Sequence, residues 1–240
     1  MVICDQAYLL HARPYAESSV IAQLLTADNG VVSVIVRGVQ SKTRKAQNLR
    51  ASLQMGNRLA LQWLPQRIAG SGLKTITDVT VVDVFTIHSN RQFLCVAYVA
   101  ELLLRVLPQE EPLPEIFALY QHTLAALSVQ NAELELPLRQ FEFALLDLLG
   151  VGIDFNWDAD ADTELAADAY YHMVAEKGLQ RCDVSHPRAL STAMCESLAQ
   201  RDFSAKEVLR MAKKVSRYQL DKLLDGRALK TRQLYQDMLS

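Results

Sequence analysis

Hydrophobic residues change their spacing once along this chain, near residue 85, and that change constrains the fold more than any other feature. Before it, apolar residues alternate with polar or smaller ones, as Val20, Ala22 and Leu24 do. This two-residue period is typical of strands with one buried face. Asp28-Asn29-Gly30 then offers a tight hairpin turn. After residue 85 the spacing becomes helical. The chain is therefore predicted to be α+β and to be built in two parts.

The first part, residues 1–84, contains five strand-like segments. They lie near residues 7–12, 20–24, 32–36, 59–63 and 76–84. An insert, residues 38–55, separates the third segment from the fourth and has room for a short helix. Five strands with an insert after the third are typical of an OB-fold β-barrel, which is the predicted fold of this domain. An SH3-like barrel stays the alternative, because strand count alone does not separate the two.

The second part, residues 85–240, is predicted to be an all-helical domain with one irregular insertion. The expected helices cover residues 91–107, 115–127, 137–150, 204–224 and 231–239. Pro137 suits a first helical turn and Gly150 a helix end. Ser204 to Glu207 form a capping box at the start of the basic C-terminal helices, which span residues 204–239. Residues 154–187 are acidic and show no clear period, so they are expected to be the irregular insertion.

Charge is distributed unevenly, although the whole chain carries a net charge of only −2. Residues 1–80 hold nine basic and four acidic side chains, a net charge of +5. Residues 81–200 hold six and eighteen, a net charge of −12, and residues 201–240 hold ten and five, again +5. Basic ends around an acidic middle favour separate surfaces for separate partners.

The sequence gives no indication of export or of membrane insertion. The first ten residues include Asp5 and lack the basic lead of a signal peptide. The most apolar stretch, residues 93–107, contains Glu101 and is shorter than the roughly 20 residues of a membrane span. The four cysteines form no Cys-x-x-Cys pair. Free thiols in a reducing cytoplasm are therefore expected.

No motif in the chain predicts catalysis. Gly70–Thr75 resembles a phosphate-binding loop, but Leu73 stands where a glycine must precede the lysine. A turn between two barrel strands is the better interpretation of this segment. The chain has no Gly-x-Ser-x-Gly, and its five histidines have no evident carboxylate partner. The sequence therefore predicts a protein that is not an enzyme and has no catalytic residues.

Two groups of residues have the chemistry of metal ligands without the usual spacing. Alternating acids over residues 158–164 have the oxygen spacing of a calcium loop but lack its glycine at the sixth position. His172, Cys182, His186 and Cys195 could gather around zinc. Their spacing lacks the short paired ligands that closed zinc sites usually have. We therefore expect no metal, zinc included, and no other cofactor.

Basic residues gather in two segments whose pattern indicates nucleic-acid binding. Lysine and arginine displace counterions from phosphates. In the second segment, spacings of 4, 3 and 4 residues place the cations on one face of a helix. The predicted DNA-binding residues are Arg37, Lys42, Arg44, Lys45 and Arg50 in the insert, and Lys206, Arg210, Lys213 and Arg217 in the helix. The insert has no evident aromatic platform, which favours contact with the nucleic-acid backbone over base reading. An ordinary solvated surface stays the alternative for either segment alone.

Three stretches of the chain together carry a recognisable pattern. The first is Tyr8–Ser19, YLLHARPYAESS, and the second is Val36–Lys42, VRGVQSK. The third pairs Leu138–Leu146, LRQFEFALL, with the terminal Gly226–Leu234, GRALKTRQL. In their order and spacing, over essentially the whole chain, these stretches resemble the RecO family of bacterial DNA repair proteins.

The resemblance implies a protein that binds single- and double-stranded DNA and anneals complementary strands. It implies action with RecR in loading RecA onto DNA coated with single-strand-binding protein (SSB), and association with the nucleoid. It also implies a site for the acidic C-terminal tail of SSB. For this site we select Arg139, with Leu138, Phe141 and Leu145 beside it as the edge of an apolar groove. A guanidinium can pair bidentately with the tail's carboxylate. The alternative is that Arg139 pairs with Glu135 or Glu142 along its own helix.

Many members of the family carry a four-cysteine zinc module after the helix that ends in Leu-Leu-x-x-Leu-Gly. Here Asn156-Trp157-Asp158 stands where the first ligand is expected, and no paired cysteines follow. The resemblance thus implies a degenerate zinc module within residues 154–187. Two other functions stay open: an OB-fold RNA-binding or translation-associated factor, and a structural adaptor whose basic surfaces bind acidic proteins.

Overall fold

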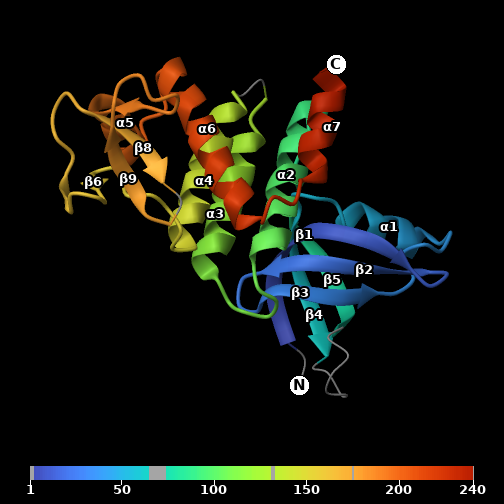
Figure 1. Cartoon of the computed structure of the whole chain (residues 1–240). Helices are drawn as coiled ribbons and strands as arrows, with labels where there is room; N and C mark the ends of the chain where they lie inside the picture. Colours follow the sequence, from blue (N-terminus) through green and yellow to red (C-terminus); the bar gives the residue numbers. More distant parts are fainter. Residues whose placement is uncertain (1–2, 65–73, 131–132, 175, 240) are drawn as a thin grey trace. The chain divides into compact units, whose positions relative to one another are not determined.

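The computed structural model of the protein describes residues 3–64, 74–130, 133–174 and 176–239 (Figure 1). The chain divides into two compact units. Residues 1–134 and 224–240 form unit 1, and residues 135–223 form unit 2. The end of the chain therefore returns to the unit that contains its beginning. The predicted domain boundary after residue 84 stays a prediction, although the last barrel strand ends at Asp83 and the first long helix begins at Asn90.

Unit 1 begins with a closed five-stranded barrel, drawn in blue to cyan in Figure 1. Its strands are β1 (Ile3–Tyr15), β2 (Ser19–Thr26), β3 (Gly30–Val36), β4 (Arg58–Leu64) and β5 (Lys74–Asp83). They are hydrogen-bonded in the order β1-β2-β3-β5-β4, and β4 pairs with β1 to close the barrel. Helix α1 (Arg44–Ser52) lies between β3 and β4. The OB-fold prediction is confirmed. The turn predicted within Gly70–Thr75 lies largely outside the described residues.

The alternation of apolar residues fills the barrel. Leu24, Val34, Leu61 and Trp63 are among the side chains that form its buried core. Trp63 is fully buried. Each of these residues belongs to an alternating series found in the sequence, because successive side chains of a strand point to opposite faces. Burial of large apolar side chains contributes about 1.5–3 kcal/mol each.

The turn between β2 and β3 depends on one glycine. Gly30 has φ of +66°, a left-handed conformation that other residues adopt at a cost. A Cβ atom at this position would lie 1.9 Å from the carbonyl oxygen of Glu111. Asn29 donates from Nδ2 to Asp5 at 2.7 Å and fixes the turn against β1. Both the backbone angle and the close approach therefore require glycine at position 30.

Three helices complete unit 1. They are α2 (Asn90–Val106), α3 (Pro114–Leu127) and α7 (Lys230–Leu239). Helix α2 is buried along most of its length, as its nearly uniform hydrophobicity predicts. Tyr8 of β1 packs edge-on against Tyr120 of α3, with ring centroids 5.2 Å apart. Helix α7, drawn in red, lies along α2 (Figure 1).

Unit 2 combines three helices with a small sheet. The helices are α4 (Glu135–Leu148), α5 (Thr192–Ala199) and α6 (Lys206–Leu223). The sheet contains β6 (Trp157–Asp158), β7 (Thr163–Glu164), β8 (Tyr170–Val174), β9 (Gly178–Cys182) and β10 (Leu190–Ser191), in the order β10-β8-β9-β6-β7. The insertion over residues 154–187 therefore differs from the expectation, because it contains short strands and is not irregular throughout. Its strands are only two to five residues long, too short to establish a period in the sequence.

The core of unit 2 joins the sheet to the helices. Phe143 of α4 packs against Phe155 and Phe203, with ring centroids 6.1 and 5.1 Å away. Tyr171 of β8 and Leu179 of β9 are buried in the same cluster. The small sheet is thus stabilised by side chains from helices on both sides of it in the sequence. Among the described residues, no helix combines the length and the hydrophobicity that crossing a membrane requires.

Candidate nucleic-acid interface

The basic insert forms a loop and helix α1 on the barrel. Arg37, Lys42, Arg44 and Lys45 are all exposed. Leu49 of α1 packs against the barrel core and so fixes the helix on the barrel. The structure therefore gathers the predicted cations on one connection, between β3 and β4, with their charged groups in solvent.

Hydrogen bonds hold the loop in place before any ligand is bound. Arg50 donates from Nη1 to the carbonyl oxygens of Val39 at 2.5 Å and Ser41 at 3.1 Å. The hydroxyl oxygen of Thr43 accepts from the backbone N–H of Ala46 and caps α1. A preorganised loop loses less conformational entropy when it binds a ligand. Arg50 therefore positions the loop, whereas the sequence alone predicted that it contacts DNA; that contact stays a prediction.

The first turn of α1 contains two cations and no acid. Arg44 and Lys45 are its first two residues. Cations at a helix N-terminus oppose the helix dipole and typically cost about 0.3–1 kcal/mol each. A bound phosphate reverses this effect, since helix N-termini attract anions. The two cations therefore destabilise α1 slightly in the free protein and favour the binding of an anion near its N-terminus.

Helix α6 presents the second basic segment in unit 2. Lys206, Arg210 and Arg217 are exposed, and Val208 and Val215 are buried on the opposite side. Lys213 is half-buried, and its Nζ lies 2.6 Å from Glu135 Oε1. Much of its charge is therefore compensated. Lys214 is exposed and was not predicted, although its spacing of four residues from Arg210 was visible in the sequence.

The residues selected for the SSB tail are buried on helix α4. Phe141 and Leu145 are fully buried, and Leu138 and Arg139 are 9% and 7% exposed. Arg139 Nη1 lies 3.0 Å from Glu142 Oε2 and 3.5 Å from the hydroxyl of Ser216 on α6. Ser216 donates to the same Glu142 oxygen at 2.5 Å. Arg139 Nε has no hydrogen-bond partner among the described residues. The guanidinium is mainly a buried partner of Glu142, and its role toward a tail stays a prediction.

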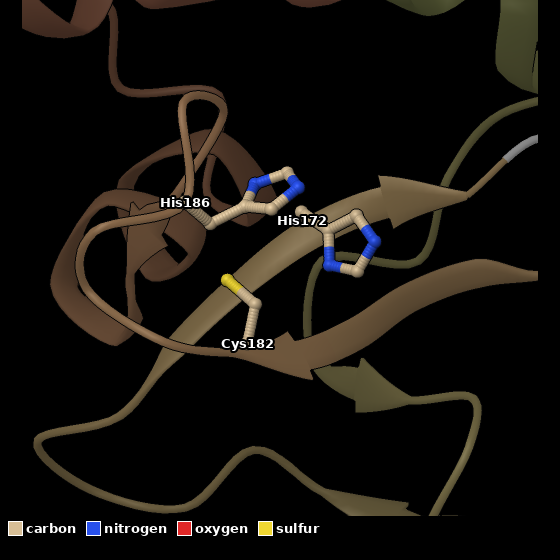
Figure 2. A group of neighbouring side chains, drawn as sticks. All are labelled: His172, Cys182 and His186. Atoms are coloured by element: carbon tan, nitrogen blue, oxygen red, sulfur yellow. The ribbon is translucent and has the colours of Figure 1, made fainter.

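Three of the four candidate zinc ligands come together in unit 2, as Figure 2 shows. One ligand atom from each of His172, Cys182 and His186 lies within 4.8 Å of the other two. Burial, and to a smaller extent the charge of Asp183, raises the pKa of the Cys182 thiol. Cys195 lies outside this group. It is fully buried in α5, and burial, with smaller contributions from Glu196 and Cys182, raises its pKa to about 12.

Comparison with known proteins identifies the family. The family model described as "Recombination protein O N terminal" matches residues 1–85. The model described as "Recombination protein O C terminal" matches residues 90–233. The chain belongs to the RecO family. The resemblance seen in the sequence is confirmed.

Individual RecO proteins are similar over nearly their whole length. The DNA repair protein RecO of Pseudoalteromonas atlantica is 34% identical over 232 residues, which cover 95% of this chain and 92% of the relative. That of Serratia proteamaculans is 32% identical over 236 residues, covering 98% and 94%. That of Coxiella burnetii is 31% identical over 234 residues, covering 97% of both chains. RecO membership supports a role in DNA repair and recombination, and neither matched family is a catalytic one.

Proposed function

We propose that this RecO protein binds single- and double-stranded DNA through the β3–α1 connection and helix α6. The observation that carries the proposal is the exposed cluster of Arg37, Lys42, Arg44 and Lys45 on a loop that is already ordered. Such a surface neutralises phosphates without reading bases. Its lack of sequence preference suits a protein that acts on DNA of any sequence.

The finer role rests on family membership. We propose that the protein anneals complementary strands and acts with RecR to load RecA onto SSB-coated single-stranded DNA, in association with the nucleoid. Two DNA strands repel each other through their phosphates, and basic surfaces that bind both strands reduce this repulsion. No covalent bond is made or broken in this process, so no catalytic residue is needed.

We further propose that the SSB tail binds at α4 beside Arg139. The unpartnered Nε–H of Arg139 supports this, because a buried donor without a partner costs about 1–3 kcal/mol and a carboxylate would satisfy it. Leu138 keeps a small exposed surface, and the apolar side chains of Phe141 and Leu145 follow it three and seven residues later on the same helix. The tail's carboxylate must share the guanidinium with Glu142, or replace Glu142 as its partner.

The DNA-binding proposal is tested by the salt dependence of binding. In the triple variant Lys42→Ala, Arg44→Ala, Lys45→Ala, the slope of log affinity against log salt for single strands should flatten by about 0.7 per lost contact, about 2 in all. The matched control removes three exposed cations of unit 2: Lys177→Ala, Arg181→Ala, Arg188→Ala. Its slope should stay near that of the unchanged protein. Fluorescence anisotropy with one labelled oligonucleotide over a salt series measures both.

Equal slopes in the unchanged protein and the triple variant would mean that the loop cations are only solvated. Repeating the series with an RNA oligonucleotide of the same sequence separates DNA from RNA binding. A preference for RNA would favour an RNA-binding factor, since contacts to 2′-hydroxyls distinguish the two. Binding to neither would favour an adaptor of acidic proteins.

A further inference from the structure

The hairpin of β8 and β9 places two potential metal ligands on one face. His172 pairs with Gln180, and Tyr170 pairs with Cys182. His172 and Tyr170 are two residues apart on β8, so their side chains share a face, and Cys182 lies on that face opposite Tyr170. His172 and Cys182 are thus diagonal neighbours across the two strands, a position from which side chains can meet.

The loop after β9 returns a third ligand to the same face. The carbonyl oxygen of Asp183 accepts from the backbone N–H of His186 at 3.0 Å and closes a turn. The Asp183 carboxylate accepts from the backbone N–H and the hydroxyl of Ser185 at 2.8 and 2.7 Å. His186 consequently lies over His172, with ring centroids 4.4 Å apart (Figure 2). These bonds order the loop with three side chains already converging.

One nitrogen of this group lacks a partner. His172 Nδ1 is buried from solvent and has no hydrogen-bond partner among the described residues. Buried polar atoms nearly always have a hydrogen-bond partner, so a buried nitrogen without one points to a ligand that binds there. Imidazole nitrogen and thiolate sulfur are the donors that zinc prefers in proteins. We propose that His172, Cys182 and His186 bind one zinc ion, with water as the fourth ligand.

Small movements of the three side chains would bring their ligand atoms to the separations found around zinc. Zinc bonds of about 2.0–2.1 Å to nitrogen and 2.3 Å to sulfur place tetrahedral ligands about 3.3–3.6 Å apart. The present separations are within 4.8 Å, and rotation of the side chains can supply the difference. One contact opposes the ion: the backbone N–H of Arg188 donates to His186 Nδ1 at 3.2 Å. A neutral imidazole bonded in this way carries its proton on Nε2. Zinc must therefore displace this hydrogen bond, either by binding Nδ1 directly or by binding Nε2 after the proton has moved to Nδ1.

This proposal replaces the expectation of no metal. That expectation relied on the absence of paired cysteines, and a module of four cysteines does not fit this chain. However, Cys182 and His186 are a pair with three residues between them, and the turn between them brings both to His172. The fourth candidate, Cys195, is not required.

Cobalt(II) is the probe for the test, because it replaces zinc and reports thiolate ligation through a charge-transfer band in the near ultraviolet. The full-length protein, stripped of metal with a chelator, should bind one cobalt ion with this band, and zinc should remove the band by displacement. Cys182→Ser should abolish the band. His172→Ala and His186→Ala should each weaken cobalt binding at least about 100-fold, because even changes to groups behind a ligand cost 10–100-fold.

Two control variants remove one cysteine and one histidine that lie outside the proposed site. Cys4→Ser removes the exposed cysteine of β1, and His122→Ala removes an exposed histidine of α3. Both should bind cobalt like the unchanged protein. A second measurement needs no variant: zinc should protect Cys182 of the unchanged protein from alkylation by iodoacetamide and leave Cys4 reactive, as read by peptide mass. The absence of one bound cobalt per chain, or alkylation of Cys182 at the same rate with and without zinc, would overturn the proposal and leave a stacked histidine pair.

Discussion

Arg139 and Glu142 form an ion pair whose side chains are 8% and 2% exposed. Removing one partner of a buried pair leaves the other charge uncompensated, which typically costs about 3–5 kcal/mol. Arg139→Ala should therefore lower the free energy of unfolding by about that amount. The double variant Arg139→Met, Glu142→Leu should lose much less, because both charges leave together. Urea unfolding measures both, with the exposed Arg181→Ala as a control expected to change stability by less than about 0.5 kcal/mol.

The double variant also separates stability from partner binding. It keeps an apolar core and lacks the guanidinium, so it should bind the isolated SSB tail peptide at least about tenfold more weakly, the equivalent of one charged hydrogen bond. Its affinity for bare DNA should be unchanged. A double variant that unfolds like the single one would show that the pair is required for packing. Equal peptide affinity would place the tail elsewhere.

At the scale of elements, helix α7 is held by a carboxylate from another helix. Glu101 of α2 accepts from the backbone N–H groups of Lys230 and Thr231 at 3.0 and 2.9 Å, and from the Thr231 hydroxyl at 2.7 Å. Burial alone would raise the pKa of Glu101, but the hydrogen bonds from Thr231 and Lys230, with the charge of Arg105, lower it overall. The ionised carboxylate therefore caps α7 in the place of an N-cap residue.

A lowered pKa in the folded protein adds stability that is present above the ordinary value of 4.5 and is lost as pH falls below it. Glu101→Gln should therefore destabilise the protein at pH 7, by about 1 kcal/mol as for a lost helix cap. The difference from the unchanged protein should shrink as the pH falls through the folded-state pKa. Urea unfolding over a pH series measures this, and the exposed Glu17→Gln is the control. A difference that does not depend on pH would mean that the carboxylate's charge is not involved.

Elements with a sustained period could be predicted from the sequence, and the others could not. Helix α2 has apolar residues at most of its 17 positions, and strands β2 to β5 alternate, so these elements were predicted close to their observed ends. Strand β1 (Ile3–Tyr15) extends beyond the predicted segment, residues 7–12, at both ends. The strands β6, β7 and β10 have two residues each, and α5 has eight. Elements this short depend on packing around Phe143 and Tyr171, and such contacts are not encoded in local spacing. For the same reason the spacing of His172 and Cys182, which the sequence offered among four candidate zinc ligands, did not show that the hairpin register brings these two together.

At the scale of the whole molecule, the sequence shows which segments are basic but not which structural unit each segment belongs to. The C-terminal cations form one run in the sequence, yet α6 belongs to unit 2, whereas Arg227, Lys230 and Arg232 belong to unit 1. Arg232 lies over the ring of Tyr98, with its guanidinium carbon 5.6 Å from the ring centroid. Contacts of this kind join residues more than 100 positions apart, which no window of a single sequence reports. Each unit therefore carries a basic surface of its own.

Because the chain has two basic surfaces, the loss of either one is predicted to lower the rate of strand annealing. If the β3–α1 connection and α6 each hold one strand, the loss of either surface should slow annealing by about tenfold or more, since each lost phosphate contact weakens binding. The variants are Lys42→Ala, Arg44→Ala, Lys45→Ala for the first surface and Lys206→Ala, Arg210→Ala, Arg217→Ala for the second. Each variant should still bind one single strand through its intact surface. Annealing of complementary strands, bare and coated with SSB, gives the rates.

Mixing the two variants tests whether one protein molecule holds both DNA strands or two molecules hold one strand each. We expect no recovery of the annealing rate in the mixture, because every molecule in it lacks one of the two surfaces. The unchanged protein at half concentration is the control for dilution. Recovery to near that control would show that different molecules hold the two strands, and that annealing depends on their association. An unchanged rate in both variants would contradict the role of these surfaces in annealing, whatever their contribution to DNA binding.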